Sequence, residues 1–192
     1  GPSRPMELII PARTLSELSR IISDEDEEIL ISIPEGRNQV IFHLANVDIA
    51  STLLDGKFPD YNAIIPKNFT TSTFAYTADL LRACKRADIF ARDVNNNARI
   101  IVTPADSPTA PGMVRMSASS TERGDAEAVV DATVEGEQQE ISFNVRYMID
   151  VLNVIREEQV VLQSNGPTAP GLIKPVGRDD FVHVIMPMSV GR

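Results

Sequence analysis

The sequence predicts an α+β fold assembled from three copies of one β-α-β-β-β unit. Three leading segments, which begin at Ile9, Phe74 and Phe143, recur about 65 to 68 residues apart, and each runs from an extended apolar stretch into an amphipathic helix. Each helix is followed by β-rich sequence, as in an α+β layout with mostly antiparallel strands and helices on one side. A repeat at a fixed period is typical of a fold that stacks one supersecondary unit.

An identical pentapeptide, Pro-Thr-Ala-Pro-Gly, supports the duplication. It occurs at residues 108–112 and 167–171, in both cases directly before a predicted strand of units two and three. Convergent turn chemistry is the alternative explanation, because three of the five residues are proline or glycine.

The first unit begins near Leu8. Its helix is expected at residues 12–22, where Pro11 is tolerated at the opening turn. Alternating apolar and polar residues predict strands at 28–33, 40–44 and 49–54. Residues 57–68 contain two prolines and no clear period, which is typical of an ordered connector.

Units two and three repeat this order. Helices are expected at residues 77–91 and 144–156, and strands at 99–103, 112–119, 127–134, 159–163, 171–175 and 181–185. Together these two units would form one complete domain, and unit one would be half of a preceding domain. We therefore place the domains at residues 1–66 and 67–192. Because such units pair, an odd number of them suggests a piece of something larger.

Composition limits the class of protein. The 192 residues suit one or two domains, and no apolar run approaches the ~18 residues of a membrane span. The single cysteine, Cys84, excludes an internal disulfide and fits a reducing cytoplasm. It lies in a helical stretch, where a small buried hydrophobe is expected rather than a nucleophile.

Basic and acidic residues are distributed differently along the chain. The net charge is −9, with the acids concentrated in turns and strand edges. Arg82, Lys85 and Arg86 share one helical face, and Arg13 and Arg20 share another. These faces are either the solvated outer sides of packed helices or a basic surface lined by equivalent helices.

The sequence contains few groups of residues that could act together in catalysis. The two histidines, His43 and His183, lie in separate predicted strands and have no partner at metal-ligand spacing. The acidic run 24–28 could bind a hard cation, although such a run is usually a solvated turn. We therefore predict a protein that is not an enzyme and needs no cofactor or metal.

The apolar stretch 184–188 ends the last predicted strand and carries Met186 and Met188 around a proline. It either packs as the edge of a final strand or forms one wall of a groove for a partner peptide, where methionine allows repacking. Pro59, Ile64 and Ile65 would lie at the same seam between domains, where ligand sites are frequent.

Three motifs together resemble one family. The segment 55–61 (Asp-Gly-Lys-Phe-Pro-Asp-Tyr), the helix start 143–147 with 150–152, and the terminal 184–188 are similar to the bacterial DNA polymerase III β subunits, the sliding clamps. The motifs occur in family order and spacing, and the resemblance covers nearly the whole chain. It implies the DNA clamp fold, with the second half of the middle domain followed by the third domain.

The resemblance also implies a function. Family members have three domains, and two protomers close head to tail into a ring that encircles duplex DNA. They are non-catalytic, cytoplasmic processivity factors that tether the DNA polymerase III alpha subunit, the clamp loader and other clamp-binding proteins. The residues expected to face DNA are Arg13, Arg20, Arg82, Lys85, Arg86 and Arg146.

A peptide-binding pocket between the middle and third domains is implied as well. The matching positions are Pro59, Ala63, Ile64, Asn144, Tyr147, Thr168, Pro170, Val184, Ile185, Met186, Pro187, Met188, Ser189 and Val190. Ala63 and Ser189 stand where many members have arginine, so we expect a weaker polar contact at the rim. We also expect an incomplete pocket, because part of its wall belongs to the absent half-domain.

Ile89 and Phe90 match the apolar contacts of the family's subunit interface. Because the partner first domain is absent, we expect a monomer, or a non-native dimer, that cannot close a ring. Two other functions stay open on the residues alone. The first is an adaptor that binds peptides but not DNA, and the second is a metal-assisted hydrolase that uses the run 24–28.

Overall fold

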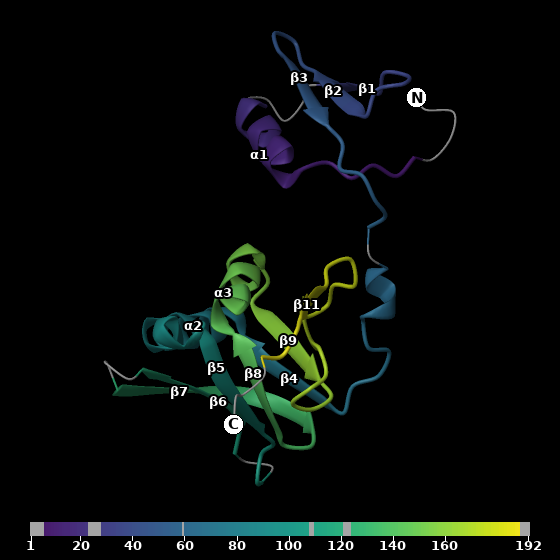
Figure 1. The fold of residues 1–192 in the computed structure, drawn as a ribbon. Helices are drawn as coiled ribbons and strands as arrows, with labels where there is room; N and C mark the ends of the chain where they lie inside the picture. Colours follow the sequence, from purple (N-terminus) through teal and green to yellow (C-terminus); the bar gives the residue numbers. More distant parts are fainter. Residues whose placement is uncertain (1–5, 23–27, 59, 108–109, 121–123, 189–192) are drawn as a thin grey trace. The chain divides into compact units, whose positions relative to one another are not determined.

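The computed structural model describes residues 6–22, 28–58, 60–107, 110–120 and 124–188. The chain divides into two compact units, residues 1–60 and 61–192, which are described separately (Figure 1).

The smaller unit is one helix packed on a three-stranded antiparallel sheet. It contains α1 (Ala12–Ile21), β1 (Leu30–Ser32), β2 (Gln39–His43) and β3 (Asp48–Thr52), in the order β1-β2-β3. Leu18 from α1 is buried with Val40 and Phe42 from β2. The helix ends one residue before the expected position, because Ile22 turns to an extended conformation while its N–H caps the Leu18 carbonyl at 3.0 Å.

Among its described residues, the larger unit contains eight strands and two long helices. The strands are β4 (Thr71–Tyr76), β5 (Asn97–Thr103), β6 (Gly112–Ser120), β7 (Gly124–Gly136), β8 (Gln139–Asn144), β9 (Gln159–Ser164), β10 (Gly171–Pro175) and β11 (His183–Ile185). The helices are α2 (Thr77–Ala91) and α3 (Val145–Val154), with the short 3-10 helices η1 (Tyr61–Ala63) and η2 (Arg92–Val94). The sheet order is β11-β10-β9-β4-β7-β6-β5-β8, and all pairs are antiparallel.

This order has an internal twofold symmetry. β4 lies between β7, the last strand of its own β-α-β-β-β repeat, and β9, the first strand after the helix of the other repeat. β8, the leading strand of that other repeat, pairs in the equivalent way with β5, the first strand after helix α2. Equivalent backbone hydrogen bonds begin the two helices: Thr77 N–H donates to Glu158 O at 2.9 Å, and Val145 N–H donates to Asn96 O at 2.8 Å. The predicted α+β fold with repeated units is therefore confirmed.

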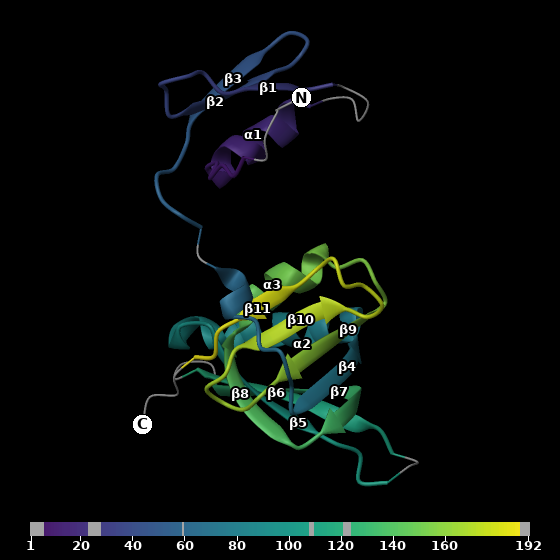
Figure 2. The same ribbon diagram turned by 90° about the vertical axis from the view of Figure 1, so that its right-hand side faces the viewer.

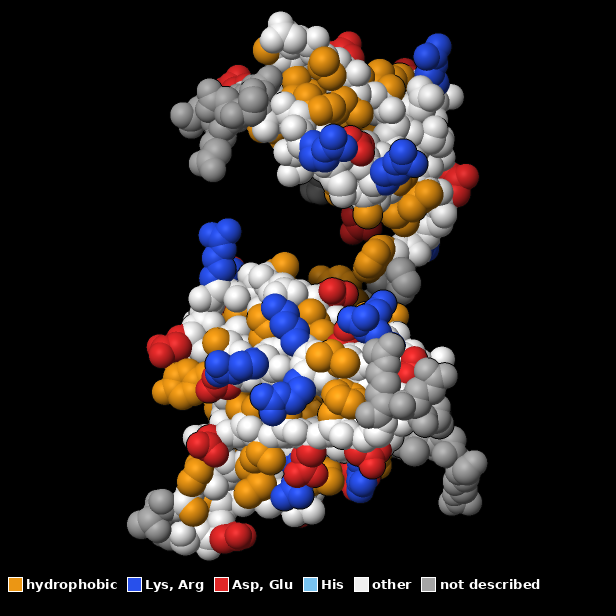
Figure 3. Space-filling model, turned by 90° about the vertical axis from the view of Figure 1, so that its left-hand side faces the viewer, with side chains coloured by type: hydrophobic (Ala, Val, Ile, Leu, Met, Phe, Trp, Pro, Cys, Tyr) orange, Lys and Arg blue, Asp and Glu red, His pale blue; other side chains and the backbone are white. Residues whose placement is uncertain are grey.

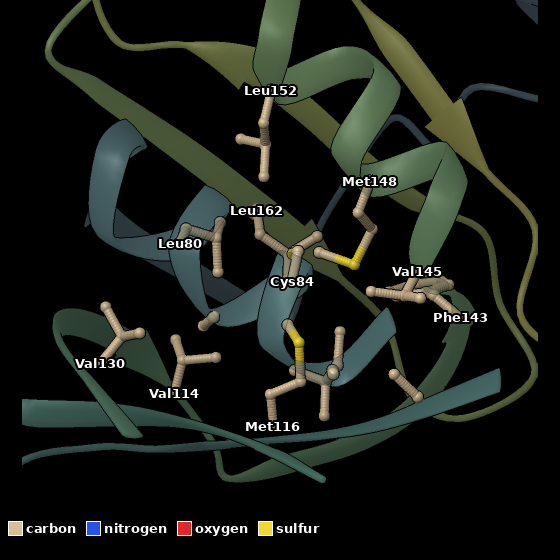
Figure 4. Packing of buried hydrophobic residues seen from close by; sticks show 14 of the residues in the cluster. Leu80, Cys84, Val114, Met116, Val130, Phe143, Val145, Met148, Leu152 and Leu162 are labelled. Carbon is tan, nitrogen blue, oxygen red and sulfur yellow. The ribbon is translucent and has the colours of Figure 1, made fainter. Parts of the chain in front are cut away.

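The two helices lie together against one face of the sheet and enclose the main core (Figure 2). Leu80 and Cys84 from α2 meet Met148 and Leu152 from α3 above the strand residue Met116 (Figure 4). All five side chains have 2% or less of their surface exposed. Burial of each large apolar side chain stabilises the fold by about 1.5–3 kcal/mol.

Local chemistry explains the element ends that differ from expectation. Helix α3 begins at Val145, because Asn144 is its N-cap and accepts a hydrogen bond from Arg146 N–H at 3.0 Å. Strand β7 extends from Gly124 to Gly136, longer than the expected 127–134, because it pairs with β6 over residues 124–132 and with β4 over residues 133–136.

Gly171 lies where a side chain would collide with the core. A Cβ at this position would be 2.5 Å from Cζ of the Phe143 ring and 3.3 Å from Cγ2 of Ile185. We expect Gly171→Ala to lower the free energy of unfolding by about 1–3 kcal/mol, because the buried ring must shift. Urea denaturation measures the change.

The Phe143→Leu background is the matched control, because leucine removes the ring tip that causes the clash. Gly171→Ala should cost at least about 0.5 kcal/mol less in that background. Equal costs in both backgrounds would contradict the steric explanation.

Candidate functional site

The chain after β11 runs back to the base of α3. Val184 and Ile185 pair with Leu172 and Gly171 of β10. Beyond the strand, Met188 N–H donates to Ser142 O of β8 at 2.7 Å. Because β8 leads directly into α3, this bond holds residues 186–188 beside the first turn of the helix.

An exposed apolar surface results, here called the terminal patch and defined by Tyr147, Pro170, Met186, Pro187 and Met188. Tyr147 and Met186 have exposed fractions of 56% and 59%, and the other three are partly buried. Pro170 belongs to the patch because it precedes Gly171, the β10 residue that pairs with Ile185. Met186 is therefore available at the surface, and Met188 is available only in part.

The other predicted pocket residues have different positions. Ile185 is only 2% exposed and belongs to the main core, so it supports the patch from below, whereas Val184 is partly buried. Asn144 is occupied as the α3 N-cap, and Thr168 is exposed in the turn before β10. Pro59, Ser189 and Val190 lie outside the described residues.

Ala63 and Ile64 are exposed at the end of η1, where Ile64 N–H donates to Tyr61 O at 3.0 Å. In both ribbon views η1 lies on the side of the larger unit that carries β11 and α3 (Figures 1 and 2). Ile64 thus adds a further exposed apolar side chain, 46% exposed, on the side of the larger unit that carries the terminal patch.

His183 is a feature of this region whose environment the sequence did not indicate. Burial of its imidazole lowers the pKa, and the Asp150 carboxylate on α3 partly offsets this by raising it. Its Nε2 has no hydrogen-bond partner within the part of the chain that the structure describes. The electrostatic link to Asp150 joins β11 to α3 beside the patch.

Basic side chains gather on the exposed face of α2 (Figure 3). Lys85 and Arg86 are exposed and make no salt bridge with any described residue. Arg82 pairs with Asp79 one turn earlier, and Arg146 from the start of α3 reaches Asp88 near the end of α2 at 3.2 Å. The two helices therefore present a shared face with two uncompensated positive charges.

The smaller unit has a similar arrangement on α1. Arg13 is exposed, whereas Arg20 is held by Glu17 at 3.0 Å. On the strands of the larger unit, by contrast, acids pair with bases, as in Arg99–Glu140 at 2.6 Å. The hydrogen bond from Arg99 lowers the pKa of the Glu140 carboxyl and keeps it ionised.

The end of α2 carries the two residues predicted to lie at the interface between protomers. Ile89 is 47% exposed, whereas Phe90 packs partly against the main core. Ile89 therefore offers about half of its side chain to a partner, and Phe90 offers less.

The residues that the structure describes give little support for a metal site, a membrane-spanning helix or a cysteine nucleophile. They contain no group of three potential metal ligands and no helix long and apolar enough to cross a membrane. Residues 24–27 of the acidic run lie outside them. Burial raises the pKa of the Cys84 thiol to about 12, which is unfavourable for a nucleophile.

Comparison with known protein families identifies the family to which the chain belongs. Two family models of the DNA polymerase III beta subunit match the chain: the model of its C-terminal domain matches residues 62–189, and the model of its central domain matches residues 2–60. The chain belongs to the DNA polymerase III beta subunit family.

Its relatives are bacterial sliding clamps. The chain is 35% identical over 187 residues to the beta sliding clamp of Staphylococcus aureus (strain Mu50), which covers 97% of this chain and 48% of that protein. The crystal structure of the Bacillus subtilis DNA polymerase sliding clamp superposes with a TM-score of 0.85 at 32% identity, covering 98% of this chain and 48% of that one. The Pseudomonas aeruginosa DNA polymerase III subunit beta gives 0.87 at 28% identity, covering 98% and 50%. The chain spans about half the length of the curated relatives it matches.

The environment of His183 predicts a pH dependence. Because the folded pKa lies below the ordinary value of 6.5, the unfolded chain binds a proton first, and stability is lost as pH falls below about 6.5. NMR titration of the His183 ring protons should give a pKa below 6.5. Asp150→Asn should lower it further, because the favourable charge is removed.

Asp179→Asn, which removes an almost fully exposed carboxylate elsewhere in the same unit, serves as the control and should leave this pKa unchanged. A pKa of His183 that rises in Asp150→Asn would contradict the assignment of the two opposing causes.

Proposed function

We propose that this chain is part of a ring-shaped, non-catalytic processivity clamp of DNA replication. In this proposal residues 1–66 are the second half of a middle domain, and residues 67–192 are the third domain. Family membership over the whole chain supports the proposal. The observation that carries it is the uncompensated basic pair, Lys85 and Arg86, on an exposed helix face of a chain with net charge −9.

In the proposed clamp the helices α1, α2 and α3 face duplex DNA, and the acidic strands lie outside. The contacting side chains would be Arg13, Arg20, Arg82, Lys85, Arg86 and Arg146. Phosphate contacts are independent of base sequence and sensitive to salt. Such contacts orient the ring without fixing it, so it can slide.

The second proposed element is a peptide site centred on the terminal patch. Tyr147 and Met186 would give apolar contacts to short segments of the DNA polymerase III alpha subunit, the clamp loader and other clamp-binding proteins. Ala63, Ile64, Thr168 and Val184 would extend the site, with Asn144 at its edge and Ile185 beneath it. Pro59, Ser189 and Val190 complete the proposed set.

The third element is the interface between the protomers of the complete clamp, formed in this chain by Ile89 and Phe90. A full-length clamp would close as a head-to-tail homodimer, in which those two side chains would meet the first domain of the other protomer. The 192-residue chain, which spans about half the length of its curated relatives, is not expected to close a ring by itself. Its proposed location is the cytoplasm, where bacterial DNA is replicated.

Removal of the basic pair should weaken DNA binding. We expect Lys85→Gln/Arg86→Gln to reduce the affinity for a short duplex at low salt, and to make the slope of log K against log salt shallower by up to about 1.8, for two lost phosphate contacts. Fluorescence anisotropy of a labelled duplex across a salt series measures both.

The matched control is Arg99→Gln/Arg115→Gln, which makes the same change in net charge on the strands and should leave the slope unchanged. Equal effects of the two double variants would contradict a DNA-facing role for α2. Peptide binding without any DNA binding by the parent chain would instead favour the adaptor hypothesis.

The peptide site is tested separately. Tyr147→Ala and Met186→Ala should each weaken binding of a clamp-binding peptide from the polymerase alpha subunit about tenfold, because each removes an exposed apolar contact of about 1–2 kcal/mol. Isothermal titration calorimetry gives the dissociation constants. Val154→Ala is the control, since Val154 is 63% exposed on the same helix but at its far end. The site assignment fails if Val154→Ala weakens binding as much as the other two.

A further inference from the structure

A hydrogen-bonded row of serine, histidine and aspartate crosses the three-stranded sheet of the smaller unit. Ser32 ends β1, His43 ends β2 and Asp48 begins β3. The Oγ atom of Ser32 lies 2.8 Å from Nε2 of the His43 ring, and Nδ1 of the same ring lies 2.8 Å from Oδ1 of Asp48. Each ring nitrogen is therefore hydrogen-bonded to a side chain from a different neighbouring strand.

The strand register places these three side chains on one face of the sheet. His43 pairs directly with Asp48, and Ser32 pairs with Ile41, two residues before His43. Because residues two apart in a strand share a face, Ser32 lies diagonally opposite His43. Phe42, the neighbour of His43 in β2, is buried in the core of the unit. The row therefore lies on the face of the sheet that points away from this core.

The two partners fix the tautomer of the imidazole. At neutral pH the carboxylate of Asp48 accepts hydrogen bonds and cannot donate one, so Nδ1 of His43 carries the ring proton. Nε2 is then the acceptor, and the Ser32 hydroxyl donates to it. A neutral imidazole that is oriented by a carboxylate and accepts the hydroxyl proton is the arrangement that activates serine for acyl transfer.

The row is accessible from solvent. The side chains of His43 and Asp48 are 34% and 65% exposed, and Ser32 is partly buried. Leu30, which pairs with His43, is exposed on the same face, and Ile41 is partly buried beside Ser32. These two side chains offer an apolar surface to a short acyl chain.

We propose that Ser32 is an acyl acceptor and that the row transfers acyl groups from activated esters of short carboxylic acids. Ser32 Oγ attacks the carbonyl carbon of the ester while its proton passes to Nε2 of His43. The bond between that carbon and the leaving oxygen then breaks, and the leaving oxygen takes the proton from Nε2. The products are an alcohol or a phenol and an ester on Ser32.

Water completes the cycle by the same route. The water oxygen attacks the carbonyl carbon of the Ser32 ester while Nε2 of His43 accepts its proton. Ser32 Oγ takes this proton as the carboxylic acid leaves. The row supplies only a general base and its orientation, a contribution of about 10²–10⁴-fold, so the ester must bring a good leaving group.

The sequence did not indicate this row, because strand pairing brings its members together. Ser32 and Asp48 are 11 and five residues away from His43 along the chain. The clamp function proposed above requires no chemistry at this position. Failure of one proposal therefore leaves the other unaffected.

Labelling of the full 192-residue chain with a fluorophosphonate, a probe that loses fluoride to an activated serine, tests the proposal. Peptide mass spectrometry should show Ser32 labelled at least about tenfold faster than any other serine. His43→Gln should slow labelling of Ser32 about 100-fold, because the general base is lost. Release of p-nitrophenol from p-nitrophenyl acetate should fall in Ser32→Ala and His43→Gln alike.

Ser51→Ala is the matched control for the ester assay. Ser51 Oγ lies 2.7 Å from Oγ1 of Thr14 in the same unit, a hydroxyl pair without a histidine, so its loss should leave p-nitrophenol release unchanged. Labelling of Ser32 no faster than of other serines, or labelling that persists in His43→Gln, would overturn the proposal.

Asp48 is a positioning residue, and its role is tested by the ¹⁵N chemical shifts of the His43 ring. The parent chain should carry the ring proton on Nδ1. Asp48→Asn, whose amide donates to Nδ1, should move the proton to Nε2 and slow labelling of Ser32 at least about tenfold. Asp55→Asn, which removes a carboxylate that accepts from Asn38 instead, should change neither. A parent ring protonated at Nε2 would overturn the proposed proton route.

Discussion

The exchange of leading strands between repeats is the constraint on which the structure depends. A single repeat has one helix and a small sheet, and it leaves apolar side chains uncovered at both, as Leu15 and Ile31 show in the smaller unit. In the larger unit the pairing of β4 with β9 and of β8 with β5 brings α2 and α3 together over one core. Buried apolar area, rather than any single contact, therefore requires the repeats to occur in pairs.

The same exchange positions the terminal patch. β8 belongs to the second repeat of the larger unit but pairs with β5 of the first repeat. Its other edge is therefore available to the chain that follows β11, and Met188 N–H donates a hydrogen bond to Ser142 O at that edge. The alternation of side chains then sends Ile185 into the core and Met186 outward. The surface proposed for peptides is thus a consequence of closing the domain, and its shape depends on core residues such as Phe143 beneath Gly171.

Much of this was predictable from the sequence. The bounds of α2 were predicted to the residue, because its apolar periodicity and basic face are strong, and the other elements were predicted within a few residues. The exchange of strands was not predictable, since periodicity gives the faces of a strand but not its neighbour. The sequence likewise did not predict that Ile185 is buried or that Asn144 caps α3. The burial depends on contacts with segments far away in the sequence, and the cap depends on backbone geometry. The environment of His183 depends on Asp150, which the sequence places 33 residues away.

The distribution of ion pairs bears on how a sliding clamp would hold DNA. Of the six basic residues proposed to face phosphates, Arg20, Arg82 and Arg146 are already paired with acids on the helices. Exposed pairs of this kind contribute only about 0–1 kcal/mol to stability, so structural need is a weak reason for them. These ion pairs have a stronger effect on the electrostatic field, because each paired acid reduces the positive potential at the helix face. A ring retained by topology needs enough charge to stay centred and too little to bind tightly, and partial neutralisation of the cations satisfies both requirements.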